Sequence, residues 1–179
     1  MEAAKVIVNL ALSFGGWVYG GYVRDVTICQ LDRFNDLDIA ICEDVNMDTF
    51  LKCLGSLGGV LVVKEDYSFQ NPYGSPSGKR LVKVVIAGTL NVDIYVVKSF
   101  EDWCNDHSCD MTCNIFYKSA KCLLGLRYVP DEFLYNPDPA GYLLAMTEAK
   151  RFVSIQATTE KFEGRKRARI DAGWLEIEL

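Results

Sequence analysis

The stretch from residue 15 to residue 39 limits the possible folds most, because it places apolar, glycine-rich and acidic segments in a fixed order. A short run of β-formers leads into Gly20 and Gly21, where missing side chains let backbone N–H groups approach a phosphate at the start of the next helix. That helix carries Arg24 and Asp25. The order therefore predicts a strand, a tight turn and a helix that together can hold an anionic ligand.

An acidic strand follows, with Asp36 and Asp38 two residues apart. Side chains at positions i and i+2 of a strand point to the same face, so both carboxylates can contact one cation. Carboxylate oxygens bind hard cations such as Mg²⁺, and two such ions can hold the attacking and leaving oxygens of a phosphoryl transfer. We interpret the pair as a metal-dependent nucleotidyl-transfer site. The structural alternative is a solvated pair of acids at a strand edge or turn.

These segments resemble the head domain of the poly(A) polymerase and CCA-adding branch of the nucleotidyltransferase superfamily, which is DNA polymerase β-like. The family pattern GG-x-VRD followed by D-x-D-[IL] matches residues 20–25 and 36–39, and the resemblance covers roughly residues 15–135. It implies an α/β (α+β) fold, a mixed and mostly antiparallel sheet of about five strands with helices packed on one side. It also implies transfer of a nucleoside monophosphate from a nucleoside triphosphate, with ATP favoured and Mg²⁺ or Mn²⁺ as cofactor.

A third carboxylate, Asp93, lies in an apolar run at residues 91–97. This run and residues 80–87 flank residues 88–90, a pattern typical of a β-hairpin. A carboxylate inside an apolar strand is costly unless a partner or a ligand satisfies it. The family has a third carboxylate on the strand after its D-x-D pair, so the resemblance assigns Asp93 to the metal site or to accepting the proton of the attacking hydroxyl. The alternative is an outward-facing strand acid.

The segment at residues 109–115, CDMTCNI, is similar to the family motif RRDFTINAL. Asp110 and Asn114 are kept, whereas Ser108 and Cys109 replace the two family arginines. The family uses this segment to shape the nucleotide pocket around sugar and phosphates. The resemblance thus implies six nucleotide-binding residues, three for the triphosphate and three for the sugar: Gly20, Gly21, Arg24, Asp25, Asp110 and Asn114.

Each of these nucleotide-binding assignments has a structural alternative. The two glycines could form a tight turn without a ligand, and Arg24 could pair with a neighbouring carboxylate. The retained motif residues could cap a helix start. Because both motif arginines are replaced, Arg24, Lys118 or Lys121 would have to compensate for them.

The C-terminal part, residues 136–179, is predicted to be a short helical appendix to a catalytic head at residues 1–135. Helices are expected at about residues 142–153 and 158–172, followed by a possible closing strand at residues 174–179.

A basic stretch lies in this appendix, between residues 150 and 169. Seven Lys or Arg stand there against two acids, in a chain whose net charge is −5. That overall charge excludes a protein that coats nucleic acid through its net charge, so any nucleic-acid contact must be local. The stretch is either a solvated helix face or a weak nucleic-acid contact, made by Arg165, Lys166, Arg167 and Arg169.

The rest of the chain predicts an ordinary single domain of 179 residues. Helices are expected at residues 3–14 and 44–55, a strand at residues 60–63, and a mobile loop at residues 68–78 that could act as a lid. The N-terminal apolar run is too short for a membrane helix, and no cleavage site follows it. We therefore expect a soluble, cytoplasmic protein.

The seven cysteines are odd in number and include no CxxC pair, so they do not form a disulfide framework. A rival chemistry is a zinc site, because four possible ligands fall within ten residues: Cys104, His107, Cys109 and Cys113. Their spacing is not that of a recognised zinc finger.

The expected partners are a nucleoside triphosphate and, by resemblance, the 3′ end of an RNA or tRNA. A small molecule or a protein hydroxyl is the alternative acceptor. Two other classes stay open: a catalytically degenerate nucleotide-binding regulatory module, and a zinc-stabilised interaction domain.

Overall fold

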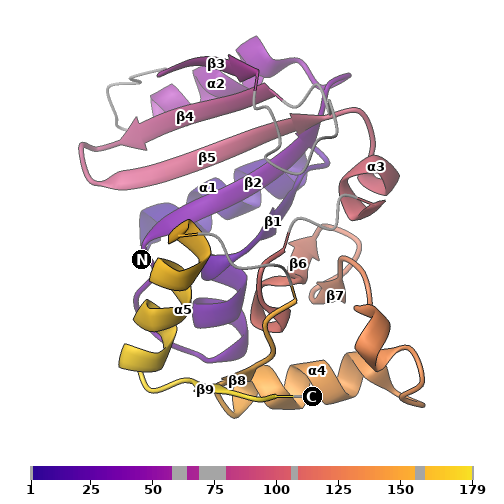
Figure 1. The fold of residues 1–179 in the computed structure, drawn as a ribbon. Helices are drawn as coiled ribbons and strands as arrows, with labels where there is room; N and C mark the ends of the chain where they lie inside the picture. The colour runs from indigo at the N-terminus through magenta and orange to yellow at the C-terminus, as the bar shows by residue number, and fades with distance from the viewer. Residues whose placement is uncertain (1, 58–63, 69–79, 106–108, 156–159, 179) are drawn as a thin grey trace.

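The computed structural model describes residues 2–57, 64–68, 80–105, 109–155 and 160–178 (Figure 1). The strand expected at residues 60–63 lies outside the described residues. So do His107, Ser108 and the expected lid loop after its first residue, Ser68.

The first half of the described chain builds most of the sheet. Its elements are α1 (Glu2–Ser13), β1 (Trp17–Tyr19), the π-helical turn η1 (Val23–Ile28), β2 (Asp36–Cys42), α2 (Met47–Ser56), β3 (Lys64–Ser68), β4 (Arg80–Ile86) and β5 (Leu90–Val97). The second half follows with α3 (Phe100–Asn105), the 3-10 turn η2 (Thr112–Asn114), β6 (Phe116–Ser119), β7 (Gly125–Leu126), the 3-10 turn η3 (Asp131–Phe133), α4 (Pro139–Glu148), β8 (Arg151–Phe152), α5 (Glu160–Asp171) and β9 (Leu175–Glu176).

The predicted helices exist, but their ends are set by local caps. α2 begins at Met47 because the side chain of Asn46 accepts the N–H of Thr49 at 3.0 Å. α4 begins earlier than expected because Asp138 accepts the N–H of Gly141, and it ends before Lys150, which has a φ of 53°. None of the helices in the described ranges is long and apolar enough to cross a bilayer.

The described strands form one large sheet in the order β3-β4-β5-β2-β1-β6-β7, and β8 and β9 form a separate parallel pair. Within the large sheet only β2 and β5 run parallel, so the predicted mixed, mostly antiparallel sheet is confirmed. The expectation of about five strands was too low, since the sheet has seven. The strands that were not expected are β3, β6 and β7: β7 has two residues and β6 four, and β3 is too polar to show an apolar run.

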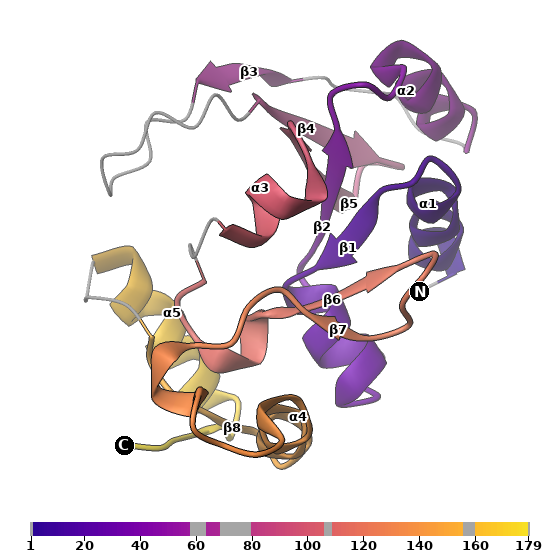
Figure 2. The same ribbon diagram turned by 90° about the vertical axis from the view of Figure 1, so that its right-hand side faces the viewer.

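Helices α1 and α2 cover one face of this sheet, as expected (Figure 2). Ala4, Ile7, Val8 and Ala11 recur at helical spacing along α1 and are buried in the main core. β2 contributes its alternate residues, including Ile39, to that core. Its remaining side chains therefore point to the opposite face.

That opposite face carries the short helix α3 and an aromatic cluster. The rings of Trp17 and Tyr19 lie 5.3 and 5.1 Å from the ring of Trp103 in α3. Helix α5 lies on the same side of the sheet as α3 (Figure 2). The sheet face opposite α1 and α2 is thus apolar where it packs against α3, and the basic helix α5 lies on the same side of the sheet.

The C-terminal segment packs against the segment around η2. Phe152, Phe162 and Trp174 form a buried cluster with Met111 and Cys113. The backbone also joins the two segments, because the N–H of residue 112 donates to the carbonyl of residue 153 at 3.0 Å. This packing fixes the position of α5 relative to the residues of the motif.

We expect Phe152→Ala to lower the free energy of unfolding by about 3–5 kcal/mol, because the side chain is fully buried in this cluster. The matched control is Leu123→Ala, whose side chain is 79% exposed and should cost less than about 0.5 kcal/mol. Urea denaturation of both variants measures the difference. Equal costs would show that the C-terminal segment is not packed as described.

Candidate active site

The three predicted carboxylates lie on one face at the centre of the sheet. The parallel register of β2 and β5 places Asp38 beside Asp93. Asp36 shares their face, because Leu37 and Ile39 between and beyond the two β2 acids point into the core under α1. Strand pairing therefore brings together acids that are far apart in the sequence.

Asp36, Asp38 and Asp93 form a carboxylate row, and neighbouring strands extend this row on both sides. Tyr19 of β1 lies opposite Asp38, and Lys83 of β4 lies opposite Asp93. The Nζ atom of Lys83 is 2.6 Å from Oδ2 of Asp93. Asp93 therefore has a cationic partner, whereas the strand neighbours of Asp38 are an uncharged tyrosine and another acid.

Gly20 and Gly21 approach the carboxylates from the end of β1. Gly20 has a φ of +68°, and a Cβ there would lie 2.4 Å from Oδ2 of Asp38. A Cβ on Gly21 would lie 3.8 Å from Oδ1 of Asp36. The structure thus brings the glycine turn against both β2 acids, and Gly20 is needed there for its conformation and for its lack of a side chain.

The carboxylates crowd one another in a partly apolar setting. Burial, reinforced by the charges of Asp36 and Asp93, raises the pKa of Asp38 to about 7. Burial and then the charge of Asp38 raise the pKa of Tyr95 to about 12. A bound cation would relieve this excess of negative charge, so the electrostatics of the row suit a metal site.

The donor set also suits a hard divalent cation, because all three side chains are carboxylates. Within the described part of the chain, neither Asp36 nor Asp38 has an ion-pair partner. As the described side chains stand, however, no three Asp, Glu, Cys or His residues are placed to hold a metal ion together. One oxygen of Asp93 is occupied by Lys83, so its joining such a site requires that ion pair to open or rearrange.

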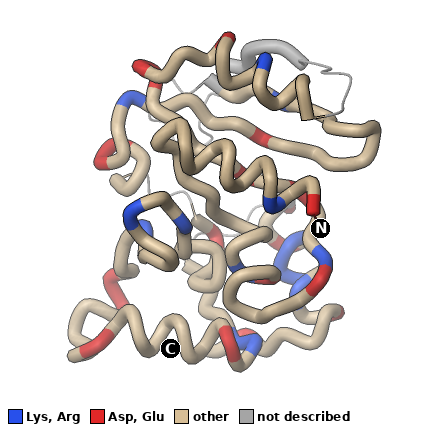
Figure 3. Tube along the Cα trace, turned by 180° about the vertical axis from the view of Figure 1, so that it is seen from behind, with Lys and Arg blue, Asp and Glu red and all other residues tan. Residues whose placement is uncertain are grey.

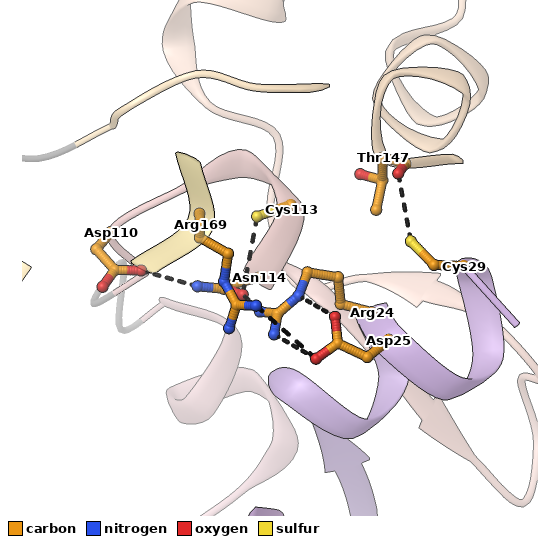
Figure 4. A network of polar contacts seen from close by, with 8 residues as sticks. All are labelled: Arg24, Asp25, Cys29, Asp110, Cys113, Asn114, Thr147 and Arg169. Carbon is orange, nitrogen blue, oxygen red and sulfur yellow. Dashed lines mark hydrogen bonds and ion pairs between the residues drawn. The ribbon is translucent and has the colours of Figure 1, made fainter. Parts of the chain in front are cut away.

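Arg24 is buried, and each of the three nitrogens of its guanidinium donates to a neighbouring side chain (Figure 4). Its Nε and Nη2 atoms donate to the two oxygens of Asp25, each at 2.7 Å. Its Nη1 atom donates to Oδ1 of Asn114. Only 1% of Arg24 is exposed, so the structure shows the carboxylate pairing that was the alternative to direct contact with a triphosphate.

The retained motif residues continue this network. The Nδ2 atom of Asn114 donates to Oδ1 of Asp110 at 2.9 Å, and Nη1 of Arg165 donates to the other oxygen of Asp110, also at 2.9 Å. Asp25, Asp110 and Asn114, which the sequence assigns to the sugar, therefore form one polar network with Arg24 and helix α5.

The four basic residues assigned to nucleic acid all belong to α5, but they have different surroundings. Basic residues gather in a blue group beside the N-terminus in Figure 3. Arg165 and Arg169 face the network, since Nη1 of Arg169 is 3.9 Å from Oδ2 of Asp25. Lys166 pairs with a carboxylate of β9 at 2.7 Å, and Arg167 is exposed.

The structure does not support the zinc alternative for the residues that it describes. Cys109 donates weakly to the carbonyl of Asn114 at 3.6 Å, whereas Cys113 lies in the cluster with Phe152. Burial raises the pKa of both thiols, that of Cys113 to about 12, which disfavours the thiolate that zinc requires. The described side chains form no Cys-containing metal group.

Lys83 was not among the predicted site residues, although the hairpin pattern places it. A hairpin pairs residues equidistant from its turn, and Lys83 and Asp93 are each five positions from Gly88. Lys118 was predicted as a possible phosphate contact. Lys118 pairs with Val18 and thus lies on the face opposite Asp38.

We expect Asp38→Asn to stabilise the protein at pH 8, by an amount that disappears towards pH 4. Because the pKa of Asp38 is about 7 in the folded state and about 3.8 otherwise, the folded state holds an extra proton between these values. The free energy of unfolding of the parent therefore falls as pH rises through this window. At about 1.4 kcal/mol per pKa unit, the upper limit of the stability gain of Asp38→Asn over the parent at pH 8 is roughly 4 kcal/mol.

Urea denaturation from pH 4 to pH 8 measures this difference, with Asp32→Asn in an exposed loop as control. An Asp38→Asn variant with the pH profile of the parent would contradict the electrostatic description of the row.

We expect Gly20→Ala to cost more stability than Gly88→Ala. Both glycines have a φ near +70°, so both variants carry the same left-handed strain of about 1–2 kcal/mol. A Cβ at Gly88 meets nothing within 4 Å, whereas one at Gly20 meets the carboxylate of Asp38. Thermal unfolding measures both, and indistinguishable losses would mean that the turn does not lie against Asp38.

Comparison with known proteins gives structural matches alone. No family model and no curated protein matches the sequence. A CCA-adding enzyme in its apo form I matches with a TM-score of 0.55 and 16% identity, covering 84% of this chain and 33% of the enzyme. The Thermotoga maritima CCA-adding enzyme complexed with tRNA matches with a TM-score of 0.55 and 15% identity, covering 99% and 39%. A CCA-adding enzyme in complex with ATP gives 0.53 and 16%, again covering 99% and 39%.

The chain spans between one third and two fifths of the length of these enzymes. At 15–16% identity these matches show a fold shared with part of the CCA-adding enzymes.

Proposed function

We propose that this protein is a metal-dependent nucleotidyltransferase, which moves a nucleoside monophosphate from a nucleoside triphosphate to a hydroxyl and releases pyrophosphate. The observation that carries the proposal is the parallel register that sets Asp38 beside Asp93, with the turn at Gly20 against the carboxylate of Asp38. A fold shared with enzymes solved in complex with ATP and with tRNA supports it.

In this proposal Asp36 and Asp38, completed by Asp93, hold Mg²⁺ or Mn²⁺. The bound metal supplies charge neutralisation to the transferred phosphoryl group. For Asp93 to join the metal ligands, its ion pair with Lys83 must open or rearrange. Asp93 then also accepts the proton of the attacking hydroxyl. The glycine turn lets the triphosphate approach the acids, so positioning and charge account for most of the acceleration.

The buried network has a supporting role in the same proposal. All three nitrogens of the buried Arg24 guanidinium donate to Asp25 or Asn114, so we assign Arg24 to holding these two side chains in place for the sugar. Asp110 fixes the amide of Asn114. Residues 1–135 act as the catalytic head, and the C-terminal part is its helical appendix.

For the acceptor we propose the 3′ hydroxyl of an RNA or tRNA in the cytoplasm, because one structural neighbour is complexed with tRNA. A small-molecule or protein hydroxyl is the alternative acceptor, since the chain spans less than half of these enzymes.

A second candidate is a nucleotide-binding regulatory module without turnover. The specific observation in its favour is the ion pair of Lys83 with Asp93, which occupies the third acid of the row. The replacement of a motif arginine by the buried Cys109 points the same way.

Incorporation of α-labelled ATP, CTP, GTP and UTP into tRNA with and without its 3′ terminal nucleotides tests the proposal, with Mg²⁺ or Mn²⁺ present. We expect label in RNA with the parent and a loss of at least about 100-fold with Asp36→Asn/Asp38→Asn, because both metal ligands lose their charge. Asp32→Asn controls for the loss of an exposed acid and should retain the parental rate.

Equal rates in the parent and the double variant would overturn the site assignment. Nucleotide binding by titration without incorporation into any RNA would favour the regulatory module, or another acceptor.

A further inference from the structure

We infer that helix α5 supplies the guanidinium groups that hold the polyphosphate of the nucleotide, namely those of Arg165 and Arg169. The identity of the ligand as a nucleoside triphosphate rests on the proposed function. The affinity of this place for a polyphosphate can be tested without it.

The need for such groups arises from where the other cations lie. Cys109 and Ser108 stand where the resembling family has arginines. Arg24 is 1% exposed, and its guanidinium is engaged by Asp25 and Asn114. Lys118 lies on the other face of the sheet. Lys83 lies in the row itself, where it pairs with Asp93 at 2.6 Å. Any further cations for a polyphosphate beside the carboxylate row must come from another part of the chain.

Arg165 is placed to meet this need. Its side chain is 57% exposed and donates to Asp110 at 2.9 Å. The network that Arg165 joins lies next to the carboxylate row, because a Cβ on Gly21 would lie 3.8 Å from Oδ1 of Asp36 and 4.0 Å from Oδ2 of Asp25. Asp110 is buried, so its ion pair with Arg165 is best kept. The guanidinium has four other N–H groups, which can donate to a phosphate oxygen while the ion pair stays in place.

Arg169 carries charge that its surroundings compensate incompletely. Its nearest carboxylate is that of Asp25 at 3.9 Å, and both oxygens of that group already accept from Arg24. Burial and then the charge of Arg24 lower the pKa of Arg169. Two guanidinium groups thus share one carboxylate, and its partly exposed side chain leaves Arg169 accessible to an anion.

The network as a whole has an excess of positive charge next to a row with an excess of negative charge. Arg24, Arg165 and Arg169 stand against Asp25 and Asp110. A polyphosphate bridging a metal at the row and the guanidinium groups of α5 would compensate both.

An RNA backbone is the other possible source of phosphate. A variant of Arg167 distinguishes an RNA ligand from a free polyphosphate. Arg167 lies on the same helix but is exposed, whereas Arg165 and Arg169 turn towards the motif residues. A ligand held by the inward pair alone is a compact polyphosphate, whereas a strand lying along the outer face of α5 would also use Arg167.

Calorimetric titration with inorganic tripolyphosphate tests the inference on the full chain. We expect Arg165→Gln/Arg169→Gln to weaken binding by roughly tenfold or more, because two charge-assisted hydrogen-bond donors are lost. Arg167→Gln removes the same charge from the same helix and should change the affinity by less than about twofold. Arg165→Gln alone guards against misfolding, since its side chain is largely exposed, and should still weaken binding by about threefold or more.

Parental affinity in both inward variants would overturn the inference, and so would a parent that does not bind tripolyphosphate. Loss of affinity for a short unphosphorylated RNA in all three variants, with tripolyphosphate binding unchanged, would assign the helix to RNA and also overturn it. The incorporation assay decides the proposed function separately: a parent that binds tripolyphosphate through α5 but transfers no nucleotide to RNA would support this inference while refuting the proposed transfer to an RNA 3′ hydroxyl.

Discussion

The burial of the Arg24 guanidinium is the constraint on which the arrangement of the site depends. Desolvation is the largest single effect and opposes its charge, but the hydrogen bonds to Asp25 and the charges of neighbouring acidic groups together more than offset it, so the pKa of Arg24 lies above its usual value. A buried cation must have its donors satisfied, and here Asp25 takes two of them and Asn114 a third. Because Asn114 belongs to η2, this requirement ties the glycine turn to the motif segment, and through Asp110 to α5.

The carboxylate row, in contrast, holds like charges that no neighbouring group in the described chain fully compensates. Asp36, Asp38 and Asp93 are brought together by strand pairing, not by attraction, and the raised pKa of Asp38 records the cost. The aromatic cluster of β1 and α3 increases that cost, because Tyr19 and its neighbours exclude water from one side of the row. Such an arrangement weakens the fold unless a cation compensates it, which is the usual relation between stability and a functional site.

Much of this site was predictable from local patterns. The glycine turn, the alternation along β2 and the apolar strand around Asp93 each follow from spacing, and the hairpin at Gly88 even fixes Lys83 opposite Asp93. The edge strands were missed because β7 is too short and β3 too polar to show a period. The ends of α2 and α4 differed from expectation because single side-chain caps set them.

The sequence by itself thus determined the type of sheet and which residues could carry chemistry, since both depend on short-range periodicity. Only the tertiary structure decided how those residues are used. Arg24 reads as a ligand in its motif, yet it is buried because Asp25 and Asn114 can satisfy it. Arg165 reads as part of a solvated basic helix, yet it meets Asp110 because the C-terminal segment packs on η2. Burial and long-range pairing arise from the packing of distant segments, and no local pattern contains them.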